Sequence, residues 1–310
     1  MTVGVAWIRE RPNGDELWLA SDSRLSGDGY LWDSSPKLFL VPRRDAVAAF
    51  SGETAQAYPL LLQIGNAMLG YEPAASGGLE FARLAKHLQR VVNLMMDQLE
   101  VDPRVSGSAV AAPFRTLGDV VVLGGYSRAA RGFVLRRLHF EQNVGRWVFG
   151  RAEGRPSVVG TSKPYKVYGD RQASPKLDYL LLDRLASVGK LGNDEPFAME
   201  PLEAIWDYLS KPAASQRPVP DGQRPPTIGG APQVVVVRSG AAATPVAVRW
   251  QDKDFVLGRQ VLPYENLTVP LIVRGEDPPR FQLIAPGAWQ PLRADAGGAE
   301  PLELDDLIEP

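Results

Sequence analysis

The sequence predicts an α+β protein in which two antiparallel sheets pack together and are covered by helices. Alternating apolar residues, typical of strands, fill the first fifty positions. Two segments with helical periodicity follow, and pairs of strand-like and helix-like segments then alternate as far as about residue 250. Because a sheet face and a helix stripe each need an apolar partner, this order of elements favours packed layers.

The N-terminal strands are bounded by turn signals. Residues 3–7 alternate large and small side chains, and residues 17–21 form the return strand after a Pro-Asn-Gly-Asp turn at 12–15. A second hairpin is predicted from residues 37–41 and 46–50. The chain therefore begins with four predicted strands.

Four helices are predicted from apolar residues that recur every three or four positions. They cover residues 53–69, 79–99, 176–187 and 201–209. His87 lies in the second of these, among leucines and valines, which indicates a packed histidine rather than a metal ligand.

The remaining strands are predicted from runs rich in valine and leucine. They cover residues 119–125, 132–138, 157–160, 233–238 and 245–250. The Pro-rich residues 211–226 predict a loop. From residue 251 onward short apolar runs alternate with Pro and Gly, and residues 300–310 are acidic. This pattern predicts a surface extension with a mobile tip, or alternatively an interface arm of an oligomer.

Composition excludes several classes of function. The chain has 310 residues, 34 Lys+Arg against 36 Asp+Glu, a net charge of −2, two histidines and no cysteine. A charge near zero argues against nucleic-acid and anionic-membrane partners. Thiolate catalysis, cysteine-ligated metals and disulfides are excluded, and multi-histidine metal sites nearly so. No apolar run approaches the ~20 residues that span a membrane, and no signal peptide is visible, so we expect a cytoplasmic protein.

The N-terminus offers an unconventional source of chemistry. If Met1 is removed, Thr2 carries a hydroxyl and a free α-amine on the same residue. An α-amine has a pKa of about 7.7–8.0, so its neutral form can act as a base near physiological pH. A threonine paired with its own amine is a known activated nucleophile. Threonine is small enough for methionine removal, and we expect that processing in the cell.

Four segments resemble, in order, the motifs of one enzyme family. They are residues 2–6, 19–27, 37–39 and 48–57. Together they resemble the proteasome β-subunit family of N-terminal-nucleophile (Ntn) hydrolases, and most closely the bacterial proteasome-like (Anbu-type) proteins.

The resemblance implies a role for each matched residue. Thr2 would be the nucleophile, with its amine as the base. Lys37 would lower the pKa of that amine, and Asp22 would hold Lys37 charged and oriented. The backbone N–H of Gly52 would stabilise the oxyanion, and Ser26 would bind the substrate chain through its backbone as an added strand.

The later part of the chain resembles the family less closely. Thr161 stands in a loop similar to the family's Gly-Ser-Gly-Ser-Pro-Tyr and takes the place of the serine near the nucleophile. Where the family has an acidic residue followed by Ser-Gly-Gly, this chain has Pro225 and Ile228. Asp221 and Thr227 are the candidates to replace that missing support.

The resemblance implies a four-layer αββα sandwich over residues 1–250, followed by a C-terminal extension over residues 251–310. The expected activity is a threonine-type hydrolase that cleaves amide bonds, most of all in peptides, through an acyl-enzyme on Thr2. No metal or organic cofactor is required, and a homo-oligomer is expected because family members assemble into rings or related oligomers. Two alternatives remain open: an Ntn amidase acting on small acylated molecules, and an inactive proteasome-like assembly protein.

Overall fold

The computed structural model describes residues 1–27, 30–52, 54–98, 121–152, 164–211, 226–275 and 280–286. The largest element of the described chain is a nine-stranded sheet. Seven of its strands form a continuous path: β10 (Tyr165–Gly169), β1 (Val3–Arg9), β2 (Glu16–Ser21), β11 (Gln233–Arg238), β12 (Thr244–Trp250), β13 (Lys253–Val256) and β14 (Arg259–Gln260). β15 (Leu271–Arg274) pairs with β12 in parallel and with β16 (Phe281–Ile284) antiparallel.

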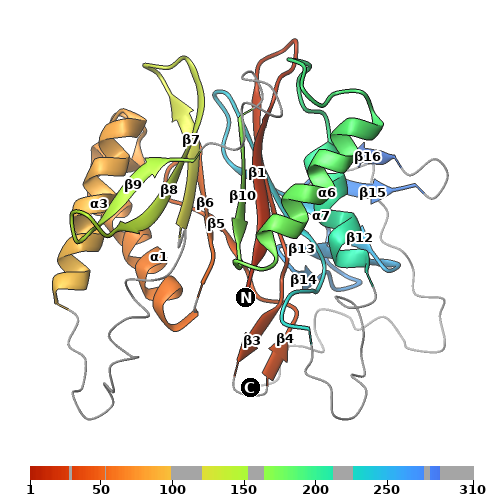
Figure 1. The fold of residues 1–310 in the computed structure, drawn as a ribbon, viewed down its shortest axis with the longest axis horizontal. Coiled ribbons are helices and arrows are strands. Elements are labelled where there is room, and N and C mark those ends of the chain that lie inside the picture. The colour runs from red at the N-terminus through yellow and green to blue at the C-terminus, as the bar shows by residue number, and fades with distance from the viewer. Residues whose placement is uncertain are drawn as a thin grey trace.

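A five-stranded antiparallel sheet faces this first sheet. Its order is β5 (Leu38–Leu40), β6 (Ala46–Phe50), β7 (Val121–Ser127), β8 (Gly132–Glu141) and β9 (Arg146–Arg151). A separate two-stranded hairpin, β3 (Leu25–Gly27) with β4 (Tyr30–Trp32), projects below both large sheets in Figure 1.

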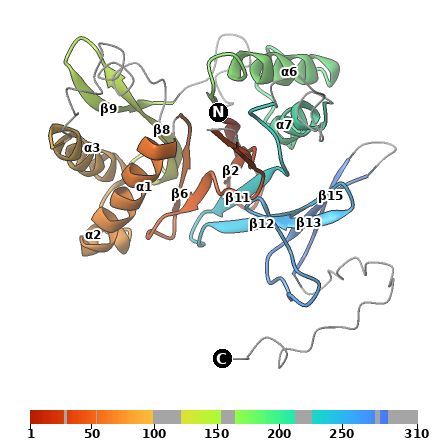
Figure 2. The same cartoon turned by 90° about the horizontal axis from the view of Figure 1, so that it is seen from below.

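Helices cover the outer face of each large sheet (Figures 1 and 2). α1 (Thr54–Leu69), α2 (Glu72–Ala75) and α3 (Phe81–Asp97) pack on the five-stranded sheet, and α6 (Ser174–Ser187) and α7 (Glu200–Ser210) pack on the nine-stranded sheet. Four of these helices were predicted within three residues at either end, whereas the short α2 was not predicted. None of the helices in the described ranges is long and apolar enough to cross a membrane.

Strand β1 is buried on both faces, and this fixes the start of the chain. Val3, Val5 and Trp7 pack toward α6 and α7, whereas Ala6 and Ile8 pack toward the five-stranded sheet. Neighbouring side chains of a strand point to opposite faces, so each face of β1 contributes to a different core. The residues just before β1 are therefore held between rigid neighbours.

The predicted two-sheet, four-layer αββα sandwich is wrong. The structure is sheet-rich, with 35% strand and 26% helix, and its described residues form three mostly antiparallel sheets and five helices. Two features cause the difference. The β3–β4 hairpin pairs only with itself, and β13 to β16 widen the first sheet from beyond residue 250, with one parallel pairing between β12 and β15. Short hairpins and parallel pairings between distant segments leave no signal in local hydrophobic periodicity.

Candidate active site

Thr2 is held at the beginning of β1 by contacts on its backbone. The Asp170 N–H donates to the Thr2 carbonyl oxygen at 2.7 Å, and Val3 pairs with Gly169 of β10. A Cβ added to Gly169, whose φ is +124°, would lie 2.1 Å from that carbonyl oxygen, so only glycine fits there. Thr2 is 1% exposed, and its Oγ1 has no hydrogen-bond partner among the described residues.

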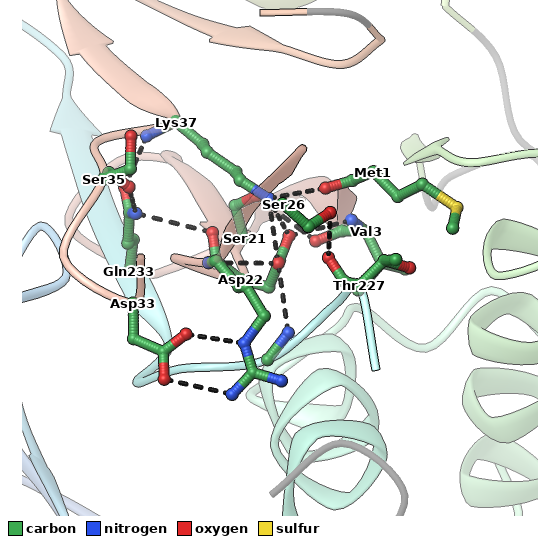
Figure 3. A network of polar contacts seen from close by, with 12 residues as sticks. Met1, Val3, Ser21, Asp22, Ser26, Asp33, Ser35, Lys37, Thr227 and Gln233 are labelled. Carbon is green, nitrogen blue, oxygen red and sulfur yellow. Dashed lines mark hydrogen bonds and ion pairs between the residues drawn. The ribbon is translucent and has the colours of Figure 1, made fainter. Parts of the chain in front are cut away.

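A buried ion pair lies beside this backbone (Figure 3). Lys37 Nζ is 2.8 and 2.9 Å from the two carboxylate oxygens of Asp22, and both side chains are fully buried. The carboxylate also accepts the backbone N–H groups of Val3 at 3.0 Å and of Arg24 and Gly229 at 3.3 Å each. A buried charge is tolerated only when it is paired and hydrogen-bonded, and Asp22 meets both conditions.

Lys37 also reaches the backbone next to Thr2. Its Nζ donates to the Met1 carbonyl oxygen at 2.8 Å. The carbonyl oxygen and the Thr2 nitrogen are joined through one carbon by bonds of about 1.23 and 1.33 Å, which places the Thr2 nitrogen within about 5.4 Å of Nζ. Figure 3 shows this bond crossing from Lys37 to Met1, above Val3. The Lys37 ammonium group is therefore close to the Thr2 nitrogen, whether that nitrogen belongs to an amide or to an amine.

Burial and neighbouring charges lower the pKa of both amines at this site. Burial lowers the pKa of the Lys37 ammonium, and the Asp22 carboxylate opposes that shift. Burial and then the charge of Lys37 lower the pKa of the Met1 α-amine, whereas Asp22 and Asp170 raise it by smaller amounts. An amine at Thr2 would be exposed to the same buried environment and the same lysine, so these effects would lower its pKa as well.

Gly52 follows the strand that packs against Lys37. The Phe50 N–H donates to the Lys37 carbonyl oxygen at 3.1 Å, and Gly52 comes two residues later, before α1 begins at Thr54. The φ of Gly52 is +103°, a conformation that a residue with a Cβ rarely adopts. The structure thus places Gly52 at the junction of β6 and α1, next to the strand that follows Lys37.

Ser26 lies on β3 and contacts a segment that is distant in sequence. Its Oγ donates to the carbonyl oxygen of Thr227 at 3.3 Å. The same segment is fixed by Arg24, which donates to the Pro226 carbonyl oxygen at 2.9 Å and forms a two-pronged pair with Asp33 at 2.6 and 3.0 Å. Arg24, which the sequence alone would leave as a turn or surface residue, is therefore a buried anchor for residues 226–229.

Some predicted residues are not placed by the structure. Thr161, Asp221 and Pro225 lie outside the described residues. Ile228, which stands where the resemblance expects a serine, is buried and apolar. Its neighbour Gly229 supplies an N–H to the Asp22 carboxylate, so the segment supports the ion pair through its backbone.

Sequence reasoning missed Gln233, which fixes the backbone of Lys37. Gln233 Oε1 accepts the N–H groups of Lys37 at 2.9 Å and Leu38 at 3.3 Å, and its Nε2 donates to the carbonyl oxygens of Ser35 at 2.5 Å and Asp22 at 3.4 Å. Gln233 is 196 residues from Lys37, so spacing gave no indication of the contact. A single glutamine at the start of a run of four valines was the available signal, since a buried polar residue needs a partner.

Asp170 was also missed. Besides binding Thr2 through its N–H, it contributes a negative charge near the N-terminal amine. Its Oδ1 accepts the N–H groups of Gln172 and Ala173 at 2.9 and 3.2 Å, which stabilises the turn before α6. The Tyr-Gly-Asp sequence at the end of β10 indicates a turn, but it does not indicate that the aspartate lies beside the N-terminus.

A pocket of about 730 Å³ adjoins Met1. Its walls are the first half of α6, the end of α7 and the segment around residue 227. The lining residues are Met1, Asp170, Gln172, Ala173, Pro175, Lys176, Tyr179, Leu180, Tyr208, Lys211, Pro226, Thr227 and Ile228.

Comparison with protein-family models and with curated proteins finds no match for this chain. The function must therefore be inferred from the site itself. The described residues place the Lys37–Asp22 pair against the Met1 carbonyl oxygen, next to Thr2, whose hydroxyl is buried.

Proposed function

We propose that this chain is a threonine-type N-terminal-nucleophile hydrolase that cleaves amide bonds once Thr2 is its first residue. One observation carries the proposal. The fully buried Asp22–Lys37 pair directs the lysine Nζ onto the peptide group between Met1 and Thr2, and the Thr2 hydroxyl is buried without a partner among the described residues. A purely structural ion pair needs no such contact with the Met1–Thr2 peptide group. The resemblance of four ordered sequence segments to the proteasome β-subunit family supports the same assignment.

Removal of Met1 would change two groups at once. The Thr2 amide nitrogen would become an amine, and Lys37 would lose the carbonyl oxygen to which it donates. The ammonium group would then stand within about 5.4 Å of the new amine, with Asp22 still paired to it. A neighbouring positive charge lowers the pKa of an amine, so the neutral basic form would be populated near pH 7.

The reaction would proceed through an acyl-enzyme. The Thr2 amine takes the proton of the hydroxyl while Oγ1 attacks the carbonyl carbon of the amide, which gives a tetrahedral oxyanion. The N–H of Gly52 would stabilise that oxyanion; loss of one such donor usually slows a reaction by about 10²–10³. Collapse breaks the C–N bond, and the protonated amine returns its proton to the leaving nitrogen. A water molecule then attacks the ester, with the amine again as base, and releases the acid and free Thr2.

Self-association is part of the same proposal. Leu62 and Leu69 on α1 and Leu94 on α3 are each more than 60% exposed, so the helical cover of the five-stranded sheet presents apolar side chains to its surroundings. Multi-angle light scattering would give a mass above that of one 33.8 kDa chain. A monomer at micromolar concentration would contradict it.

The test is acylation of Thr2 by a β-lactone, followed by intact mass spectrometry. The chain is prepared both with Met1 present and after treatment with a methionine aminopeptidase. We expect a single adduct only on the chain that begins at Thr2, loss of the adduct in Thr2→Ala, and its retention in Thr244→Ala, which removes a threonine from β12. A folded chain beginning at Thr2 that gains no adduct would overturn the proposal.

A further inference from the structure

The pocket beside Met1 reaches the residue that precedes Thr2. Met1 is one of the residues that line it, and Figure 3 shows its side chain extending away from Lys37. Asp170, whose N–H binds the Thr2 carbonyl oxygen, lines the pocket as well. Loss of Met1 therefore enlarges the pocket toward the residue that would carry the reaction.

The size of the pocket suits a small ligand. Its volume of about 730 Å³ lies within the range of roughly 300–1,000 Å³ that is usual for small-molecule sites. Gln172, Pro175, Lys176, Tyr179 and Lys211 on its rim are exposed, so the pocket is open to solvent on that side. A volume of about 730 Å³ can hold a ligand the size of one or two amino-acid residues.

The inner walls favour an aromatic or aliphatic group. Leu180 and Ile228 are apolar, and Tyr208 is half-buried among them. Burial, with smaller contributions from the charges of Asp22 and Asp170, raises the pKa of the Tyr208 hydroxyl. The hydroxyl therefore stays protonated and can donate a hydrogen bond to a ligand oxygen.

The charges at the rim favour an anion. Lys176 on α6 and Lys211 after α7 are cationic, whereas among the described lining residues only Asp170 is acidic, and its charge acts on the Met1 amine. The Asp170 carboxylate is already used by two backbone N–H groups. Lys176 forms no ion pair with any residue in the described part of the chain. Two cationic side chains, Lys176 and Lys211, thus belong to the described lining of the pocket.

We propose that this pocket binds the part of the substrate that carries an aromatic or aliphatic side chain next to a free carboxylate, with the carboxylate at Lys176 and Lys211. Its role as a substrate pocket rests on the proposed hydrolase function, whereas binding itself does not. The substrate class is therefore a small carboxylate-bearing amide, such as a short peptide end or an acylated amino acid, rather than the interior of a long polypeptide.

The test is isothermal titration of matched probes into the full chain carrying Thr2→Ala, with Met1 removed. N-acetylphenylalanine is compared with N-acetylphenylalaninamide, which lacks the charge, and with N-acetylglycine, which lacks the aromatic ring. Ion pairs with exposed lysines contribute little to affinity, so we expect the acid to bind about three- to tenfold more tightly than the amide. N-acetylglycine should bind more weakly than both.

Variants locate the binding site. Lys176→Met together with Lys211→Met should remove the preference for the acid, and Lys253→Met, which neutralises an exposed lysine on β13, should leave it unchanged. Equal affinity for acid and amide, no measurable binding, or an unchanged preference in the double variant would overturn the inference. The β-lactone experiment is independent of these titrations: absence of the adduct with the acid preference intact would reject the hydrolase and leave the pocket.

Discussion

Separating Lys37 from Asp22 should cost far more stability than the loss of an ordinary salt bridge, and the cost should depend on pH where the lysine is the group left behind. Both side chains are fully buried at 2.8 Å, a situation in which loss of one partner typically costs about 3–5 kcal/mol. The loss of stability cannot exceed the free energy needed to neutralise the charged group that is left behind. An unpaired lysine with an ordinary pKa of 10.5 becomes neutral at pH 7 for about 4.8 kcal/mol.

The pH dependence identifies which charge is stranded. In Asp22→Asn the remaining lysine would have a lowered pKa, so the unfolded state binds more protons and stability rises with pH up to about 10.5. In Lys37→Met no lysine remains, so this rise of stability with pH should be absent. In Lys37→Met the Asp22 carboxylate still accepts the N–H groups of Val3, Arg24 and Gly229. The loss of stability in this variant should therefore be near the lower limit, about 3 kcal/mol at pH 7.

Urea unfolding at pH 5, 7 and 9 measures these differences. With an m-value of about 3 kcal/mol/M, the midpoint should fall by about 1–1.6 M at pH 7. Arg259→Met, which breaks the exposed Arg259–Glu265 pair at 2.7 Å, is the control and should cost less than about 1 kcal/mol. The double variant Asp22→Asn/Lys37→Met should cost at least about 2 kcal/mol less than the sum of the single variants. Single costs below 1 kcal/mol, or the same pH slope in both variants, would refute the reasoning.

Three further predictions concern the supports of Thr2 and Lys37. Gly169→Ala should lower stability in thermal unfolding by about 1–3 kcal/mol more than Gly14→Ala, and it should also slow β-lactone acylation. Both glycines have positive φ, but only at Gly169 would a Cβ lie against the Thr2 carbonyl oxygen. Equal effects of the two substitutions would contradict this clash. The rate of acylation should rise with pH to a plateau, with an apparent pKa below 8.0. Asp170→Asn should shift this profile to lower pH, because it removes a charge that raises the pKa of the amine and keeps the Oδ1 acceptor. A shift to higher pH would exclude this role of Asp170. Gln233→Leu should cost about 2–4 kcal/mol in urea unfolding, because it leaves buried N–H and C=O groups unpaired, and a cost below about 1 kcal/mol would contradict the contacts.

The order of the elements could be predicted from the sequence because it depends on local patterns. The helices assigned to residues 53–69 and 201–209 appear as α1 and α7, since a helix buries a stripe that repeats every 3.6 residues. The strands at residues 3–7 and 233–238 appear as β1 and β11 for the corresponding reason. How the strands are grouped into sheets depends on pairings between distant segments, and there the two-sheet prediction failed.

The sequence by itself identified Thr2, Asp22 and Lys37 as candidate site residues, because their types and order resemble a known set of nucleophile, carboxylate and lysine. Only the tertiary structure decided that Lys37 lies against the Met1–Thr2 peptide group, and that Gln233 and Asp170 hold the backbones on either side. The physical reason is the distance along the chain over which each property is set. A side chain's type and its near neighbours can be read from the local sequence. The burial and the charges around it come from segments that folding brings together, here up to 196 residues apart.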